Sequence, residues 1–545
     1  MKPNNNYLCV GIAALLTCAN TELVAAPSIK LQAISSVEAS TPANYNASAA
    51  EIVAHDPGTQ RLFVVNAQAA KIDVYIISDP LNPRLFKTID VKPYGAVANS
   101  VAIKNGVVAI AVEADPKTSP GKVVFVKTSN LKVLAHVEVG AQPDMVTFTS
   151  DGHYVLTANE GEPSSYPSTP TTDPEGSVSI IDVSGGVGNV TQANVQTAGF
   201  GAFSLASLAP GVRIFGPGAS VAQDLEPEYV ATSEDSQTAW VTLQENNALA
   251  IIDIPSATVT RVVPLGTVDR SASGFDPSDR DGGLADANAD GVPDGIKIRT
   301  WPRVYGMYQP DSIASYKVGS QTYLVLANEG DARTDWPGYN EETTVGSASY
   351  KLDDPVTFPD ALTLKKPANL GRLKVSIASG DTDGDGDFDE IHAFGGRSFS
   401  IRSADGSVVW DSADQFEQIT AATYPTFFNV SNSNNTFDSR SPSKGPEPEG
   451  VAIGKVSDRT YAFIGLERIG GVMAYDISNP AAPSFADYVN NRDFTKLPAD
   501  PESGDLGPEG LIFISEENSP NGKPLVVVAN EVSGTTTIFE VDVTE

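Results

Sequence analysis

Length, composition and charge exclude several classes of protein for this chain. Its 545 residues are 41% hydrophobic, which is enough to bury a sizeable core and argues against an intrinsically disordered chain. The 68 acidic and 36 basic residues give a formal net charge of −32 at pH 7, so nucleic acid and anionic membrane surfaces are not expected as partners. The excess carboxylates either cover a solvated surface or gather around hard metal ions.

The first residues have the pattern of an export signal. Lys2 precedes an apolar run over residues 7–19, and Val24-Ala25-Ala26 has the small side chains of a cleavage site. The run is too short to span a bilayer, and no later stretch is long and apolar enough to do so. We therefore expect a signal peptide over residues 1–26 and an exported protein, periplasmic or secreted, without a transmembrane helix.

Both cysteines of the chain, Cys9 and Cys18, lie in this segment. Cleavage after Ala26 would leave a mature chain without thiols, which excludes disulfides. Outside the cytosol, bound calcium could then stabilise the fold in place of disulfides. The alternative is a lipoprotein processed at Cys18, although Thr17 fits such a site poorly.

After the signal, the chain has an all-β pattern. Short runs rich in Val, Ile, Thr and Tyr recur between Gly, Pro, Asn and Asp, without a long amphipathic helical stretch. One unit repeats: an acidic or small residue, a strand, a turn, a second strand ending in Asn-Glu or similar, and a third strand. Its copies lie at residues 51–80, 99–113, 143–184, 226–254, 310–331, 448–478 and 508–543.

Seven copies predict a seven-bladed β-propeller, because radial repetition of small sheets protects strand edges. The propeller would be a single domain over residues 27–545, and the run 29–37, which has no copy of its own, would complete the last blade. Long segments near 161–222, 266–308 and 332–445 are rich in Gly, Pro, Ser and Asp. We expect them to be loop insertions on one face, where repeat proteins commonly carry function.

Two acidic loops inside these insertions have the spacing of calcium sites. Oxygen side chains at alternate positions, followed by Gly, converge on one ion in a curled loop, and hard oxygen donors suit Ca²⁺ better than zinc. The predicted ligands are Asp286, Asn288, Asp290 and Asp294 in the first loop, and Asp381, Asp383, Asp385, Asp387 and Asp389 in the second. At the twelfth position of the second loop, where an EF-hand has a Glu ligand, this chain has His392. We therefore expect a calcium loop without the flanking helices of an EF-hand. The alternative for each loop is a solvated turn. Asp276, Asp279 and Asp281 are additional candidate ligands.

Carboxylates also recur at two equivalent positions of the repeat. Those at the starts of first strands are Glu51, Asp144, Glu228, Asp311, Glu449 and Glu509. Those at the ends of second strands are Glu113, Glu160, Glu245, Glu329, Glu467 and Glu531. Since first strands line the channel of a propeller, these acids would repel one another unless they are paired, protonated or bound to metal. We predict Glu160, Glu228, Asp311 and Glu509 as channel metal ligands; the alternative is that the acids only brace neighbouring blades.

Three arginines stand beside these acids and could bind an anion: Arg333, Arg397 and Arg468. A guanidinium fork suits phosphate or carboxylate, but a salt bridge to the neighbouring acid is an equally good interpretation. With only four histidines in the chain, a zinc site or a Ser-His-Asp triad has little support.

The motifs at residues 327–333 (ANEGDAR), 394–399 (FGGRSF) and 445–450 (GPEPEG) resemble those of the choice-of-anchor I family. The resemblance covers roughly residues 30–545. It implies an extracytoplasmic propeller, association with calcium and, for members named as alkaline phosphatases, phosphoester hydrolysis. The chain stops directly after its last predicted strand, so a C-terminal anchor is not expected.

Two functions remain open from the sequence. In the first, channel metal ions and Glu329, Glu449, Arg333, Arg397 and Arg468 hydrolyse a phosphomonoester or act on another anionic small molecule. In the second, the chain is a non-catalytic, calcium-dependent surface, binding or mineral-associated protein. Calcium is the expected cofactor in both, and the identity of a second metal in the channel is left open.

Overall fold

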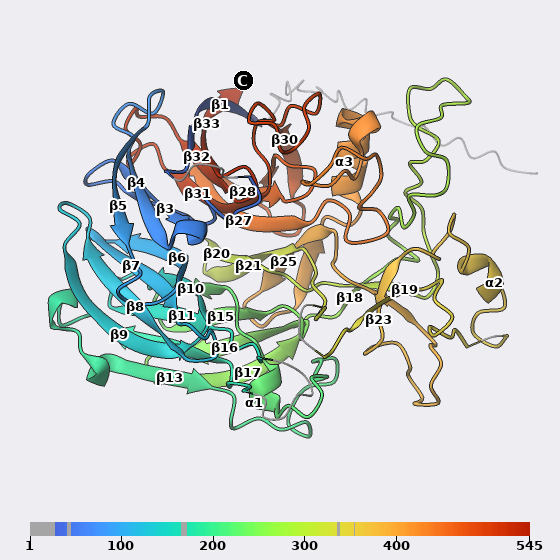
Figure 1. Cartoon of the computed structure of the whole chain (residues 1–545), viewed down its shortest axis with the longest axis horizontal. Helices are drawn as coiled ribbons and strands as arrows, with labels where there is room; N and C mark the ends of the chain where they lie inside the picture. The colour runs from blue at the N-terminus through green and yellow to red at the C-terminus, as the bar shows by residue number, and fades with distance from the viewer. Residues whose placement is uncertain (1–27, 41–44, 165–171, 335–337, 354, 545) are drawn as a thin grey trace, which may run out of the picture.

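Short apolar runs form the strands of small twisted sheets in the computed structural model, which describes residues 28–40, 45–164, 172–334, 338–353 and 355–544 (Figure 1). The export signal predicted over residues 1–26 lies outside these ranges. The second and third strands of each sheet are buried on both faces and therefore read as continuous apolar runs, as in Val107–Glu113 and Leu525–Asn530. Outer strands such as Thr258–Pro264 alternate between buried and exposed residues.

Seven sheets of four antiparallel strands are found among the described residues, one for each sequence repeat. The first four, in chain order, are β2 (Val53–Asp56), β3 (Arg61–Asn66), β4 (Lys71–Ile76) and β5 (Arg84–Asp90); β6 (Val97–Lys104), β7 (Val107–Glu113), β8 (Pro120–Lys127) and β9 (Val133–Ala141); β10 (Pro143–Phe148), β11 (Tyr154–Asn159), β12 (Ser177–Asp182) and β13 (Val195–Gly199); and β14 (Val230–Thr232), β15 (Thr238–Leu243), β16 (Ala248–Asp253) and β17 (Thr258–Pro264).

The remaining three four-stranded sheets come from the second half of the chain. They are β20 (Ile313–Val318), β21 (Gln321–Asn328), β25 (Ser398–Ser403) and β26 (Val408–Asp411); β27 (Pro448–Val456), β28 (Arg459–Leu466), β29 (Val472–Asp476) and β30 (Ser484–Val489); and β31 (Pro508–Ile514), β32 (Leu525–Asn530), β33 (Thr535–Thr544) and β1 (Ser28–Glu38).

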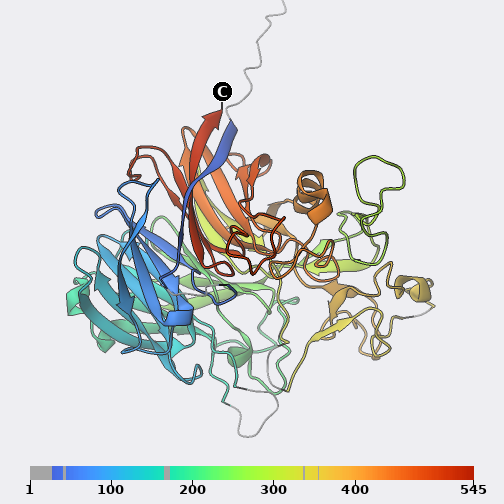
Figure 2. The ribbon, with the colours of Figure 1, turned by 45° about the horizontal axis from the view of Figure 1, so that its top comes forward.

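The first strands of these sheets contact one another in the cyclic order β2, β6, β10, β14, β20, β27, β31 and back to β2, so the sheets form a closed ring. The predicted all-β propeller is therefore confirmed. The prediction that the N-terminal strand completes the last sheet is also confirmed, because β1 pairs antiparallel with β33 from Ser28 opposite Thr544 to Glu38 opposite Thr535. In Figure 2 the blue first strand runs beside the red last strand.

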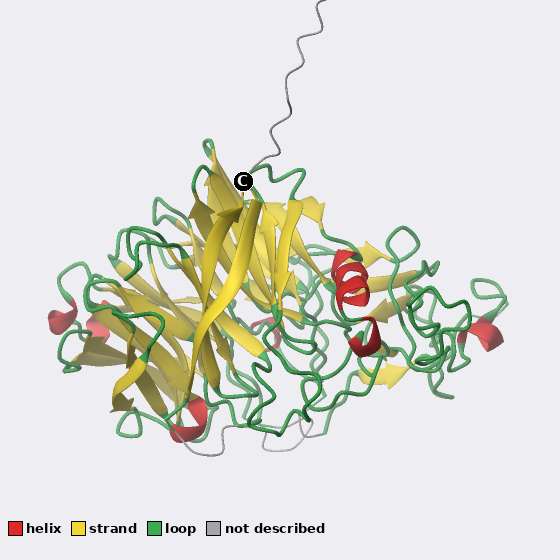
Figure 3. Ribbon diagram, turned by 90° about the horizontal axis from the view of Figure 1, so that it is seen from above, coloured by secondary structure: helices red, strands yellow, loops and turns green. Residues whose placement is uncertain are grey.

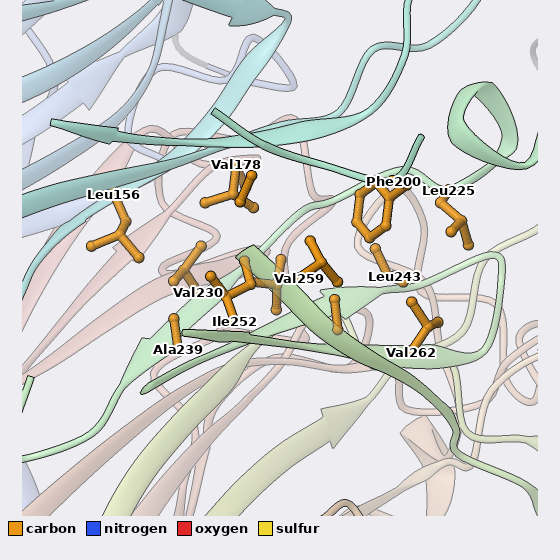
Figure 4. Packing of buried hydrophobic residues seen from close by; sticks show 14 of the residues in the cluster. Leu156, Val178, Phe200, Leu225, Val230, Ala239, Leu243, Ile252, Val259 and Val262 are labelled. Atoms are coloured by element: carbon orange, nitrogen blue, oxygen red, sulfur yellow. The ribbon is translucent and has the colours of Figure 1, made fainter. Parts of the chain in front are cut away.

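The core of the ring lies between neighbouring sheets. Between the third and fourth sheets, Leu156 and Val178 face Val230 and Ile252, and Phe200 from the following loop packs on the same cluster (Figure 4). Each interface of this kind removes apolar side chains of both neighbouring sheets from water, and this burial stabilises the ring.

The second and third long segments form a further sheet beside the ring, which the sequence analysis expected to be loops. Its strands, in spatial order, are β18 (Thr267–Asp269), β19 (Val304–Met307), β24 (Ile391–Ala393), β23 (Lys374–Ser376) and β22 (Glu342–Thr344). A separate core containing Phe275, Trp301, Tyr350 and Leu373 packs around it. Residues 161–222 also contain the ring strands β12 and β13, and residues 332–445 contain β25 and β26.

Helices are few and short among the described residues (Figure 3). They are α1 (Val221–Asp224), α2 (Ala361–Leu364), α3 (Gln415–Thr423) and the 3₁₀ turns η1 (Ala67–Ala69), η2 (Val187–Asn189), η3 (Gln192–Asn194) and η4 (Pro425–Phe427). In the part of the chain that the structure covers, no helix has the length and apolar character to cross a membrane.

Candidate metal site in the central channel

The repeated carboxylates occupy the strand positions predicted for them. Asp144, Glu449 and Glu509 lie in the first strands β10, β27 and β31, while the other strand-start acids stand just before theirs. The strand-end acids finish the second strands of their sheets or follow them within two residues. Because the first strands form the inner ring, the strand-start acids face a common channel.

A β-bulge turns several of these acids toward the channel. The pairing register shifts between Pro143 and Val146, between Pro448 and Val451, and between Pro508 and Leu511. In each case the bulged residues include the strand-start acid. A bulge adds one residue to one strand and re-aims its side chain, so the bulge and not the strand alone sets the direction of the carboxylate.

The glycine that follows two of the acids has a steric cause. A Cβ on Gly450 would lie 1.9 Å from the carbonyl oxygen of Glu509, and one on Gly510 would lie 2.6 Å from that of Glu51. The inner strands therefore approach so closely that only glycine fits after the acid. This contact explains the Pro-Glu-Gly sequence of both strands.

A cavity of about 230 Å³ opens between the inner strands. The polar side chains lining it include Glu51, Asn99, Asp144, Asp311 and Glu509. Asn99 takes the strand-start position of the second sheet, the one sheet whose repeat has no acid there. Four acids from four different sheets therefore share this cavity with Asn99 and with apolar side chains such as Ile52 and Met145.

Three of these acids form a group that we call the open triad: Asp311, Glu449 and Glu509. One carboxylate oxygen of each lies within 4.8 Å of those of the other two. Glu449 is 7% exposed, and its Oε2 is buried without a hydrogen-bond partner. Among the described residues, no lysine, arginine or histidine forms an ion pair with the triad.

The donor set of the open triad fits a hard cation. Oxygens on opposite sides of a Ca²⁺ are about 4.6–5.2 Å apart, because each lies about 2.3–2.6 Å from the ion. The three carboxylates supply only oxygen, and the unpartnered Oε2 of Glu449 is the kind of buried acceptor that otherwise costs free energy. Ca²⁺ suits this set better than zinc, which prefers nitrogen and sulfur.

A second group, the filled triad, lies in the same channel and consists of Glu329, Glu447 and Glu467. One oxygen of each again lies within 4.8 Å of those of the others. Lys444 Nζ donates to Glu329 Oε1 and lies 3.3 Å from Glu447 Oε2. Arg468 Nε donates to Glu447 Oε2 at 2.9 Å, and its Nη1 lies 2.9 Å from Glu467 Oε1.

Arg440 completes the neutralisation of the filled triad. Its Nε donates to Glu447 Oε1 at 2.8 Å. Burial alone would raise the pKa of Glu447, but Arg440, Lys444 and Arg468 hold it well below its usual range. Glu447 is therefore ionised and shared by three basic side chains.

The acids of the open triad have the opposite electrostatics. Burial, together with Glu329 and Glu509, raises the pKa of Glu449 well above its usual range. Burial and neighbouring acids also raise the pKa values of Asp311 and Glu509. Protonation of these side chains therefore competes with cation binding, so that binding a cation is coupled to proton release.

The other two predicted channel ligands lie nearby. Glu228 is 6% exposed, its Oε2 has no hydrogen-bond partner, and burial and Glu245 raise its pKa. Glu160 accepts a hydrogen bond from Gln142 Nε2, and burial and Glu162 raise its pKa. Neither residue belongs to a group of three metal-ligating side chains among the described residues.

Two of the three arginines predicted to hold an anion are enclosed by protein groups. Arg333 is 2% exposed; its Nη1 donates to Asp224, and its Nη2 donates to Glu226 Oε2 at 2.8 Å. Arg397 Nη1 donates to Glu417 Oε1 at 2.7 Å, and its Nη2 donates to the carbonyl oxygen of Ser441 at 2.6 Å. Arg333 and Arg397 therefore form salt bridges with neighbouring acids, the alternative to anion binding given in the sequence analysis.

Arg468 differs from them, because its side chain remains 25% exposed beside the filled triad. Glu329, the other residue predicted for catalysis with Glu449, accepts from Gln244 Nε2 at 2.8 Å and from Lys444. Of the five residues predicted for catalysis, only Glu449 belongs to the open triad.

The acidic loops lie outside the channel and are exposed. In the second loop, one oxygen each of Asp381, Asp383 and Asp385 lies within 4.8 Å of the others. Among the described residues Asp387 does not belong to this group, and Asp389 Oδ2 accepts a hydrogen bond from Thr382 N at 2.9 Å. These distances show a curled loop whose carboxylates converge.

In the first loop, the carboxylates bind backbone amides. Asp286 accepts from Asp290 N at 3.2 Å and from Gly291 N at 3.0 Å, and Asp294 accepts from Ala287 N at 3.1 Å. Asn288 Nδ2 donates to Asp290 Oδ2 at 2.9 Å.

Sequence reasoning missed three site residues: Glu447, which lies within the 445–450 motif but was not a candidate ligand, and the basic residues Lys444 and Arg440. Both basic residues lie just before the 445–450 motif, in a segment outside the repeat, so no equivalent position in another copy pointed to them. The spacing of Lys444 and Glu447, three residues apart, is the one local signal.

Comparison with known proteins identifies one domain family and two relatives. The profile of the choice-of-anchor I domain matches residues 51–480. Gigasin-3a of Magallana gigas is 32% identical over 191 residues, which are 33% of this chain and 67% of Gigasin-3a. Mesenchyme-specific cell surface glycoprotein of Strongylocentrotus purpuratus is 27% identical over 284 residues, which are 47% of this chain and only 35% of that protein.

Solved structures of similar shape are distant in sequence. Hydrazine synthase of Kuenenia stuttgartiensis has a TM-score of 0.46 and 12% identity, with 92% of this chain and 98% of that chain covered. Streptogramin B lyase has a TM-score of 0.43 and 9% identity, with 95% and 98% covered.

Proposed function

The chain belongs to the choice-of-anchor I domain family, and on that premise we propose that it is an extracytoplasmic β-propeller that binds calcium in its central channel. The observation that carries the proposal is the open triad, in which a buried oxygen of Glu449 lacks a hydrogen-bond partner and no basic side chain of the described residues pairs with the three acids. The similarity to a cell surface glycoprotein supports a place at or outside the cell surface.

Asp311, Glu449 and Glu509 would hold the ion, and calcium would supply the positive charge that this part of the channel lacks. The neighbouring acids, among them Asp144 and Glu51, set a negative potential that draws cations into the channel. The outer loop with Asp381, Asp383 and Asp385 would hold a second, exposed ion.

Calcium titration of Glu449→Gln tests the proposal. With free Ca²⁺ at a hundred times the dissociation constant, one site stabilises the wild-type fold by about 2.7 kcal/mol. Glu449→Gln should lose that share of the calcium-dependent stabilisation and one bound ion, measured by chemical unfolding in Ca²⁺ and in EGTA and by isothermal titration calorimetry.

Glu113→Gln is the matched control, because Glu113 is a strand-end acid outside both triads. It should keep the wild-type number of bound ions. Equal calcium binding by wild type and Glu449→Gln would refute the channel site.

A second candidate function, metal-dependent hydrolysis of a phosphomonoester at the same triad, rests on Arg468. Its guanidinium is the one of the three predicted anion-binding arginines that stays partly exposed. In this proposal Asp311, Glu449 and Glu509 would hold the ion, which would supply a Lewis acid for a phosphoryl oxygen, and Arg468 would stabilise the charge that develops.

Hydrolysis of p-nitrophenyl phosphate with and without Ca²⁺ tests this candidate. Arg468→Lys keeps the charge but removes the fork, and it should lower the rate by roughly a hundredfold while the melting temperature stays near that of wild type. Wild-type protein that binds calcium but hydrolyses no phosphomonoester leaves the non-catalytic binding protein as the function.

A further inference from the structure

A cluster of three aspartates lies outside the channel, between the inserted sheet and the segment that leads into β27. Asp276 and Asp281 come from the loop between β18 and β19, and Asp438 comes from the loop between η4 and β27. One carboxylate oxygen of each lies within 4.8 Å of those of the other two. The chain brings these residues together from positions more than 150 residues apart in sequence.

The cluster is buried and poorly neutralised. Asp276 is fully buried and Asp438 is 1% exposed, and neither forms an ion pair with a described residue. Asp276 accepts from the backbone amides of Lys297 at 2.6 Å and Ser278 at 3.2 Å, and Asp438 accepts from the Ser441 hydroxyl. Among the described residues, the cluster has one ion pair, in which Lys297 Nζ lies 3.8 Å from Asp281 Oδ2, while Arg397 Nη1 donates to the carbonyl oxygen of Asp276 at 2.8 Å.

Two buried oxygens at the cluster have no hydrogen-bond partner. The Asp281 side chain is 3% exposed, and its Oδ1 accepts no hydrogen bond. Asn429 is fully buried, and its Nδ2 donates to Ser441 Oγ at 2.8 Å, next to Asp438, while its Oδ1 is also unpartnered. A buried acceptor in this state costs free energy unless a ligand satisfies it.

The charges facing the cluster from the neighbouring elements do not cancel it. Glu417 of α3 adds a further carboxylate, but this one is occupied: Oε1 accepts from Arg397 at 2.7 Å and Oε2 from Asp276 N at 3.0 Å. Burial, together with the other two aspartates, raises the pKa of Asp438 to about 10, and burial raises that of Asp276 to about 8. In the absence of a cation the cluster must hold protons.

We propose that Asp276, Asp281 and Asp438 form a structural cation site, with the Asn429 side-chain oxygen as a further donor, that fastens the inserted sheet to the segment preceding β27. The donors are all oxygens, and Ca²⁺, which accepts six to eight oxygens in flexible geometry, suits them better than Mg²⁺ or zinc. This site is separate from the channel site and does not depend on it.

Its position connects it to the channel. Asp438 lies two residues before Arg440 and six before Lys444, the two residues that reach the filled triad, and Glu449 of the open triad follows in β27. An ion at Asp438 would therefore fix the segment that delivers both neutralising side chains and one open-triad ligand.

Hydrogen exchange of the full-length protein in Ca²⁺ and in EGTA tests the site with Ca²⁺ itself as the probe. Calcium should slow amide exchange at least tenfold in residues 276–297 and 428–441 of wild type. Asp438→Asn should abolish this protection, whereas Glu449→Gln, which alters only the channel site, should retain it. Asp269→Asn, an exposed acid of the same inserted sheet, is the control and should behave as wild type.

Chemical unfolding at pH 8 distinguishes a cation site from a cluster that is merely protonated. In EGTA, Asp438→Asn should be about as stable as wild type, because the Asp438 side chain already holds a proton there and asparagine is a neutral group of nearly the same size; in Ca²⁺ it should be less stable than wild type. Equal destabilisation in both solutions, or exchange in residues 276–297 that ignores calcium in wild type, would overturn the site. Loss of protection by Glu449→Gln would also overturn it, as a single channel ion would then explain the data.

Discussion

The open and filled triads contain the same chemistry in the same channel, yet three basic side chains surround one and none pairs with the other. Five of the six acids reach the inner ring because the repeat places an acid at the start of most first strands and at or after the end of most second strands, whereas Glu447 stands just before β27, outside these two positions. The difference arises outside the repeat, in the segment that supplies Arg440 and Lys444. A repeated scaffold thus provides the negative charge, and a non-repeated segment decides where it is neutralised by protein and where by a cation.

The largest expected effect comes from breaking the filled triad at its centre. Glu447→Gln leaves Arg440, Lys444 and Arg468 without their shared, fully buried partner, and should destabilise the fold by about 3–5 kcal/mol in Ca²⁺ and in EGTA alike. Urea unfolding measures this. Glu502→Gln removes the partner of Lys496 at an exposed pair and should cost less than about 1 kcal/mol; an equally small effect of Glu447→Gln would show that the filled triad is not held by charge.

Removing Lys444 should make the filled triad resemble the open one. Lys444→Met should destabilise by about 3 kcal/mol in EGTA, because Glu329 loses its basic partner, and millimolar Ca²⁺ should restore most of that stability. Calorimetry should then detect one more bound calcium ion than in wild type. Destabilisation without any rescue by calcium would mean that the two triads differ in more than their basic neighbours.

The pH dependence of the calcium-free protein should report the unneutralised part of the channel. Burial and Glu531 raise the pKa of Glu51 to about 8, so the folded state binds more protons than the unfolded state between about pH 4.5 and pH 8. Stability in EGTA must therefore fall as pH rises through that window, by about 2–3 kcal/mol between pH 5 and pH 7 for this group. Glu51→Gln should flatten the profile measured by urea unfolding; a profile that rises with pH would contradict the burial of uncompensated acids.

The smallest effect is expected at the exposed loop. Asp385→Asn removes one of three converging carboxylates that are already solvated, and should change stability in EGTA by about 0.5 kcal/mol or less. It should still remove one weakly bound calcium ion in a titration. Asp290→Asn in the other acidic loop is the matched comparison, since the described acids of that loop form no group of three with oxygens within 4.8 Å of one another. Unchanged calcium binding by Asp385→Asn would restrict the metal to buried sites.

The ring could be predicted from the sequence because its signal is repeated. The acid at the start of a first strand and the Asn-Glu at the end of a second recur often enough to reveal both the strands and the residues facing the channel. The N-terminal run 29–37 can be assigned to the last sheet because it is the one predicted strand that belongs to no copy of the repeat.

The inserted sheet could not be predicted, because strands of three or four residues such as Val304–Met307 and Ile391–Ala393 are too short to show a period. These two strands pair in parallel although a large part of the fifth ring sheet lies between them in the chain. The contact between Asp276 and Asp438 could not be predicted from the sequence either. Each acid lies in an irregular loop without periodicity, and only the packing of one loop on the other brings the two side chains together.

The pairing of β1 with β33 also sets the order in which the molecule can be completed. The last ring sheet takes its outer strand β1 from the N-terminal end of the described chain and its other three strands from the C-terminal end, so β1 has no partner until β33 has been synthesised. Contacts so far apart in sequence form slowly, because the intervening chain must first be ordered. A chain synthesised from its N-terminus therefore cannot close the ring until its last strands are made. A truncated molecule that lacks these strands keeps an unpaired sheet edge, and such molecules are the most prone to aggregation.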